Sequence, residues 1–189
     1  GSELQTGTHI RTSDAGLRIV VGEQSGAVSV IYIFPGTDMV LTFGEKLNPS
    51  LSNGGVFVQP GIGKGIVSLP QNGNAVATVE GSQMIVEPIG MDVRLWCFDG
   101  DCRLERPNGD SFKIPVGSYR VYHSDTDQYD ESIVMEYQQM WDWNVRCNYC
   151  LRDTVPTPTP TPTMTPTQKQ VKKEPTATHT PENIGQPRP

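Results

Sequence analysis

The chain has 189 residues and a formal net charge of −6, and since residues 154–189 contribute +2, residues 1–153 carry −8. A domain this acidic repels phosphate backbones, which argues against nucleic acid as the main partner. No run of about 18 apolar residues occurs, so we expect no membrane-spanning segment within this sequence.

The sequence predicts one folded domain followed by a tail. Gly1-Ser2 is typical of a cloning scar, and we expect membrane attachment only through sequence upstream of it. Residues 3–153 have the usual size of a single domain, with a C-terminal extension from about residue 124. Glycine and proline separate short segments rich in Val, Ile, Tyr and Phe, which is the pattern of an all-β domain. We expect one antiparallel unit, a sandwich or roll, with a solenoid-like arrangement as the alternative.

The expected strands follow one another closely along the chain. They are Leu17–Val21, Ala27–Phe34, Met39–Phe43, Gly55–Gln59, Gly65–Leu69, Ala75–Val79, Met84–Pro88, Asp92–Phe98, Cys102–Arg106, Ser111–Pro115 and Ser118–His123. Asp99-Gly100 and Asn108-Gly109 favour type I′ hairpin turns, in which both central residues need positive φ. We therefore expect the strands on either side of each dipeptide to form consecutive hairpins.

One helix is expected near the end of the domain. Residues 132–145 place Ile133, Val134, Tyr137, Met140 and Trp141 at spacings of three and four, behind a cluster of acidic residues. A strand from Ile133 to Tyr137 is the alternative.

The tail, residues 154–189, contains ten Thr and nine Pro and no aromatic residue. Such a segment buries too little apolar surface to offset its ordering entropy, so we expect a disordered stalk. The alternating Thr-Pro repeat favours extended polyproline II and is also typical of O-glycosylated stalks.

Two parts of the sequence contain short motifs around turns. The first has an I-x-T opening at Ile10-Arg11-Thr12 and a P-x-T-x-hydrophobic step at Pro35–Met39; the second runs from Ala77 to Val121 and includes Gly81, Asp99-Gly100 and Gly117. In these motifs the sequence resembles the FecR family of extracytoplasmic regulators, over roughly residues 4–123. The resemblance implies an all-β domain outside the cytoplasmic membrane, often the sensory part of a transmembrane regulator, and it brings no catalytic residues.

Four cysteines form two close pairs, Cys97 with Cys102 and Cys147 with Cys150. Two local disulfides are the leading interpretation, which indicates an oxidising location. Cross-connected disulfides and a four-cysteine zinc site are the alternatives.

Aromatic residues gather near the end of the domain. Trp143 and Tyr149, if exposed, would form a binding platform for a sugar or a partner protein, whereas Trp141 is expected to be buried. The acidic segment Asp125–Glu131 is interpreted as a solvated turn, with a Ca²⁺ loop as the alternative.

No motif of an enzyme, a metal site or a cofactor site stands out, so we expect a protein without catalytic activity and without a cofactor. We expect an extracytoplasmic sensory or regulatory domain that binds a partner protein or a small ligand in envelope signalling. A cell-surface structural or carbohydrate-binding module on a Thr-Pro stalk is the alternative.

Overall fold

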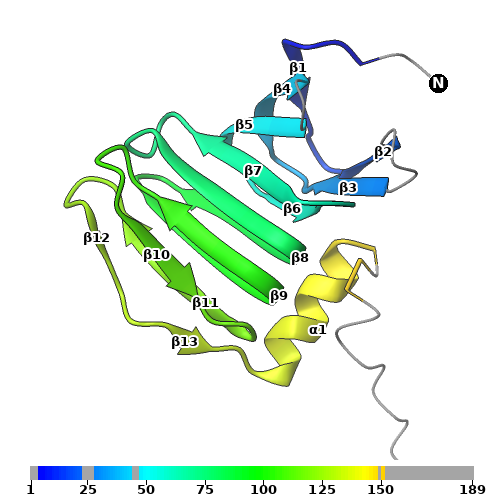
Figure 1. The fold of residues 1–189 in the computed structure, drawn as a ribbon. Helices are drawn as coiled ribbons and strands as arrows, with labels where there is room; N and C mark the ends of the chain where they lie inside the picture. Colours follow the sequence, from blue (N-terminus) through cyan, green and yellow to red (C-terminus); the bar gives the residue numbers. More distant parts are fainter. Residues whose placement is uncertain (1–3, 23–27, 44–46, 149, 152–189) are drawn as a thin grey trace, which may run out of the picture. The chain divides into compact units, whose positions relative to one another are not determined.

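Strands make up most of the computed structural model, which describes residues 4–22, 28–43, 47–148 and 150–151 (Figure 1). The expected Thr-Pro stalk lies outside the described residues. The all-β fold with one short C-terminal helix is confirmed. The elements are β1 (Thr8–Arg11), β2 (Leu17–Gly22), β3 (Val28–Ile33), β4 (Asp38–Phe43), β5 (Leu47–Asn53), β6 (Val56–Gln59), β7 (Lys64–Leu69), β8 (Ala75–Ile89), β9 (Asp92–Glu105), β10 (Ser111–Ile114), β11 (Ser118–His123), β12 (Gln128–Tyr129), β13 (Ile133–Val134) and α1 (Tyr137–Arg146).

Two long strands, β8 and β9, organise the sheet. The first half of β8 pairs with β7 and its second half with β6, while its other edge pairs with β9 almost throughout. The end of β9 pairs with β10 and its beginning with β11. One half of the β8–β9 hairpin therefore belongs to the series β5, β7, β8, β9, β10, and the other half to the series β2, β3, β6, β8, β9, β11. These pairings are antiparallel except for the contact of β5 with β7.

A crease in β8 and β9 separates the two halves. Cys97 and Cys102 are five residues apart in β9, yet their Cα atoms lie 5.8 Å apart, whereas an extended strand would separate them by roughly 16 Å. The opposite strand shifts register between Glu80 and Met84. Gly81 and Gly100, at φ of +72° and +77°, provide the backbone conformation that both strands need here.

This crease corrects the expected hairpin at Asp99-Gly100. Residues 92–98 and 102–106 do not pair with each other across a turn, because both belong to β9 and pair with β8. The hairpin at Asn108-Gly109 is confirmed, since β9 pairs with β10 from Glu105 opposite Ser111. Its turn is not type I′: Gly109 has a φ of +88°, and Asn108 is not among the residues with positive φ.

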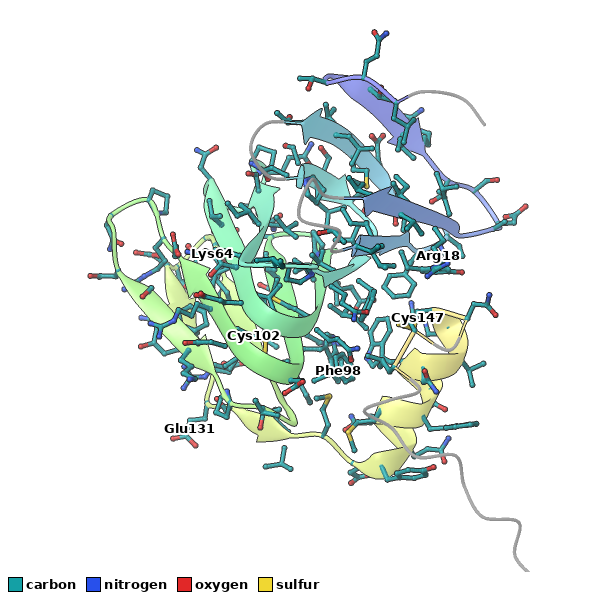
Figure 2. The ribbon with its side chains drawn as sticks, turned by 45° about the vertical axis from the view of Figure 1, so that its right-hand side comes forward. Arg18, Lys64, Phe98, Cys102, Glu131 and Cys147 are labelled. Atoms are coloured by element: carbon teal, nitrogen blue, oxygen red, sulfur yellow. A yellow bond between two sulfur atoms is a disulfide. The ribbon has the colours of Figure 1, made fainter. Side chains whose placement is uncertain are left out.

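Apolar side chains cover both faces of the central strands. In β9, Val93, Leu95 and Cys97 belong to a large core cluster with residues of β1 to β8 and β10. Trp96 and Phe98 alternate with them and belong to a second cluster, which includes Phe34, Phe57, Ile85, Met135, Trp143 and Leu151. Helix α1 covers this second face, and Figure 2 shows Phe98 directed toward it.

Helix α1 begins later than the sequence predicts. Ile133 and Val134 form β13 and pair with β11, as the strand alternative had it, and the helix starts at Tyr137. Glu136 and Gln139 form a reciprocal capping box that fixes this start.

Two threonines of the FecR-like motifs hold one corner of the fold. The Thr12 hydroxyl donates to the Phe34 carbonyl at 2.6 Å and accepts from the Thr37 N–H at 2.9 Å. The Thr37 hydroxyl, which is fully buried, donates to the Gly55 carbonyl and accepts from the Gly55 N–H, both at 3.0 Å. The I-x-T and P-x-T patterns therefore have a structural role here: they satisfy buried backbone groups where three chain segments meet.

Candidate functional site

The cysteines lie in two separate places. The sulfur atoms of Cys97 and Cys102 are 2.06 Å apart at the crease, in the large core cluster. Those of Cys147 and Cys150 are at bonding distance where α1 ends, in the second cluster (Figure 2). The pairing is the local one: each cysteine forms a disulfide with its near neighbour in the sequence, and none of the four is free. A shared four-cysteine zinc site does not fit this arrangement. Within the described residues, no group of three or more His, Cys, Asp or Glu side chains is placed to hold a metal ion.

Trp143 is buried, which corrects its interpretation as an exposed binding ring. Only 4% of the residue is exposed, and its ring lies 5.1 Å from that of Phe34 and 5.4 Å from that of Trp96. Burying the apolar surface of an aromatic side chain against the sheet lowers its free energy relative to exposing that surface to water. Trp141 is half-buried against the same cluster, and Tyr149 lies outside the described residues.

A shallow groove of about 310 Å³ runs between α1 and the neighbouring ends of β8 and β9. The sheet and the helix each contribute four residues to it. Those from the sheet are Glu87, Ile89, Arg94 and Trp96, and those from the helix are Gln139, Asp142, Trp143 and Arg146. Spacings of three, four and seven place the helical residues on one face of α1.

Stacked guanidinium groups frame the groove. Arg94 lies over the rings of Trp96 and Tyr119, at 5.7 and 5.8 Å from the ring centroids. Arg146 lies 4.0 Å from the ring centroid of Trp143. Both arginines approach the Glu87 carboxylate, at 3.9 Å from Arg94 and 3.8 Å from Arg146, which is beyond hydrogen-bonding distance. Stacking on aromatic rings holds the guanidinium planes in place while leaving their N–H edges free.

Unused hydrogen-bonding capacity remains at this groove. Arg94 Nε and Trp96 Nε1 are buried and have no hydrogen-bond partner in the described part of the chain. Two arginines and two acidic residues, Glu87 and Asp142, give the lining a balanced charge. Its guanidinium and carboxylate groups suit the binding of a polar group.

Of these groove residues, only Trp143 was a candidate binding residue from the sequence. The alternation in Val93-Arg94-Leu95-Trp96 already places Arg94 and Trp96 on one face of a strand. The missing information was that this face meets Arg146 and Asp142 of a helix about fifty residues later, because periodicity within a segment does not reveal which segments pack together.

The acidic segment Asp125–Glu131 binds neighbouring side chains. Asp127 accepts from the Tyr122 hydroxyl at 2.9 Å and pairs with Arg106 at 3.2 Å. Asp130 lies 3.2 Å from His123, whose other ring nitrogen is 2.8 Å from Asp92. Hydrogen bonds to Asp92 and then Asp130 raise the pKa of His123. Ion pairs therefore join the segment to His123 of β11 and to Arg106, the residue after β9, and β12 adds strand pairing with β11.

No helix among the described residues has the length and apolarity to cross a membrane. No protein-family model matches the chain, and no curated protein matches it. The fold is similar to two crystal structures of a "putative anti-sigma factor" from Parabacteroides distasonis, with TM-scores of 0.53 and 0.54 and 15% sequence identity in both. The similarity covers 72% of this chain and 64% and 63% of the two chains compared, so this chain spans less than two thirds of their length. At this identity the likeness establishes the fold alone.

Proposed function

We propose that this chain is an extracytoplasmic, FecR-like regulatory domain that binds a partner protein or a small ligand in envelope signalling and catalyses no reaction. The observation that carries the proposal is the fold, whose solved neighbours are described as an anti-sigma factor. The threonine corner supports it, because Thr12 and Thr37 of the FecR-like motifs share one buried hydrogen-bond network.

Two disulfides support the extracytoplasmic location. The cysteines of the first pair are fully buried and lie at the crease, so the fold depends on an environment in which they stay oxidised. The location is tested by quenching whole cells in acid and alkylating free thiols before mass spectrometry. We expect all four cysteines to resist alkylation, and four alkylated cysteines would contradict the location.

The regulatory role is tested in the organism that encodes the chain. An in-frame deletion of residues 4–151 is compared with the parent strain by RNA sequencing, and a Val145→Ala strain serves as a control because Val145 is 48% exposed and does not line the groove. We expect one set of promoters to change together in the deletion strain. A transcript profile identical to that of the parent under inducing and non-inducing conditions would contradict the proposal.

The groove is the place where we expect a ligand or a partner side chain, since two stacked arginines, Arg94 and Arg146, line it. A strain with Arg94→Gln and Arg146→Gln should reproduce part of the transcript change while the protein level stays normal. The carbohydrate-binding alternative rested on exposed rings of Trp143 and Tyr149. The burial of Trp143 removes that ring from the platform, and Tyr149 lies outside the described residues.

A further inference from the structure

Strand β2 is an unprotected edge of the sheet. It pairs with β3 alone among the described strands, without a register shift, and over six residues. It contains no lysine or proline, and it exposes 41% of Leu17 and 51% of Val20. Natural sheets normally protect such edges with charges, prolines or bulges, because free N–H and C=O groups recruit another strand.

Two other edge strands of the same sheet carry this protection. On β1, His9 and Arg11 both pair with Asp38 of the neighbouring strand. On β10, Lys113 pairs with Asp101 at 3.5 Å. Strand β2 is longer than either of these strands, with six residues against four, and Arg18 is its one charged residue.

An apolar band leads from the covered part of the sheet to this edge. Tyr32 and Val30 of β3 pack against the cluster under α1. Val30 lies opposite Val20 in the β2–β3 pair, and Val28, at the beginning of β3, is 48% exposed. The band ends at Val20, where the sheet ends, and Arg18, labelled in Figure 2, is the single charged residue of β2.

We propose that β2 is an interface with a second copy of this chain, formed by antiparallel pairing of the two β2 strands about a two-fold axis at Val20. Opposed residues of an antiparallel pair have their side chains on the same face of the sheet. In two identical strands, residues on the same face are both even-numbered or both odd-numbered, so the two-fold axis must pass through a residue and not between two residues. With the axis at Val20, Val20 of one copy faces Val20 of the second copy. Ile19 then faces Val21, and Arg18 faces Gly22.

This register is self-complementary. It continues the apolar band across the axis, from Val30 and Val20 of one copy to Val20 and Val30 of the second copy. It also places Arg18 opposite a residue without a side chain, whereas an axis at Arg18 would oppose two like charges, which destabilises a strand pair. The observation that favours a second copy as the occupant is this fit of the strand to itself, with the exposed Val20 on the axis and Arg18 opposite Gly22.

Disulfide trapping tests the register. Val20→Cys places two thiols opposite each other at about 4.5–5.5 Å between Cβ atoms, so mild oxidation should produce a covalent dimer through this position. Arg18→Cys is the matched control on the same face, because the two introduced thiols would lie four residues apart along the strands, about 13 Å. Peptide mapping identifies the bonded cysteine. Trapping through Arg18→Cys as fast as through Val20→Cys would overturn the proposed register.

Sedimentation across a concentration series tests the interface without added cysteines. The parent domain should show a concentration-dependent dimer, and Val20→Lys should raise its dissociation constant roughly tenfold or more. Val134→Lys is the control, since Val134 is 75% exposed on β13, in a different part of the sheet. Circular dichroism verifies that both variants fold, and Val20→Thr replaces Val20→Lys if the latter does not.

Two results would overturn the proposal: a monomer at every concentration with β2 amides that exchange rapidly with deuterium, or a dimer that Val20→Lys leaves intact. The proposal does not depend on the regulatory function. A domain that forms this dimer but changes no transcripts on deletion would contradict the proposed function alone.

Discussion

Cys97 and Cys102 belong to the same strand, and their Cα atoms lie as close as those of residues on neighbouring strands, at 5.8 Å. The disulfide between them closes a crease that turns one half of the β8–β9 hairpin away from the other. Without the crease, β7 and β6 would lie along one continuous edge of β8. With it, each of them pairs with its own half.

The crease should depend on the glycines that bend it. We expect Gly81→Ala to lower the free energy of unfolding by about 1–2 kcal/mol, because a Cβ is unfavourable at a φ of +72°. A Cβ at Gly81 meets no atom within 4 Å, so the cost is conformational. Gly81→Asn is the control at the same position, because asparagine tolerates a positive φ better than alanine does. Urea unfolding monitored by tryptophan fluorescence measures both, and equal effects would contradict the role of the backbone conformation.

A second prediction concerns the hydrogen bonds between Thr37 and Gly55. Thr37→Val keeps the shape of the side chain but leaves the buried Gly55 N–H without its acceptor. We expect a loss of about 1–3 kcal/mol in the free energy of unfolding. Thr37→Ser retains the hydroxyl and should recover most of this loss, so a serine variant as unstable as the valine variant would show that the methyl group, rather than the hydrogen bonds, matters.

The contact between α1 and the sheet should depend on Trp143. Replacing this 4% exposed side chain by alanine removes its ring contacts with Phe34 and Trp96, and we expect a loss of about 3–5 kcal/mol. Val145 lies on the same helix and is 48% exposed, so Val145→Ala should change stability by no more than about 0.5 kcal/mol. Calorimetric unfolding of both variants tests this, and a small effect of Trp143→Ala would show that the helix adds little to the fold.

Stability should fall as the pH rises through the pKa of His123. Its pKa in the folded protein is raised above 6.5 by hydrogen bonds to Asp92 and Asp130, so protonation is more favourable in the folded chain than in the unfolded one. The resulting stabilisation is complete below about pH 6.5 and is lost at higher pH. Unfolding of the parent and of His123→Gln is compared at pH 6 and pH 8.5. The glutamine variant should lose less stability between these values, and parallel pH profiles would contradict the prediction.

Local patterns predicted the strands better than their connections. The period-two alternation in Val93–Phe98 puts Val93, Leu95 and Cys97 on one face, and all three lie in the large core cluster. The dipeptides Asp99-Gly100 and Asn108-Gly109 carry the same turn chemistry, yet only the second is a hairpin. Glycine permits positive φ in a turn and in a crease alike, and the choice depends on β8 pairing with both halves of β9.

The groove required information that no single segment contains. Arg94 and Arg146 approach the same carboxylate of Glu87 only because α1 packs on the face of β8 and β9 that carries the second cluster. The sequence predicted a helix from apolar residues at spacings of three and four. Two of these residues, Ile133 and Val134, form β13 and pair with β11 instead. Edge strands of two residues are too short to show a period of their own.

The last described residue, Leu151, is fully buried, and its N–H donates to the Asn144 side chain at 2.8 Å. The disulfide between Cys147 and Cys150 gives a covalent route around the two residues between them. A mechanical load applied to the chain after Leu151 would therefore bypass that short loop and reach α1 directly. The load would act on Cys147, at the C-terminal end of the helix, four residues after Trp143 and its contacts with the sheet.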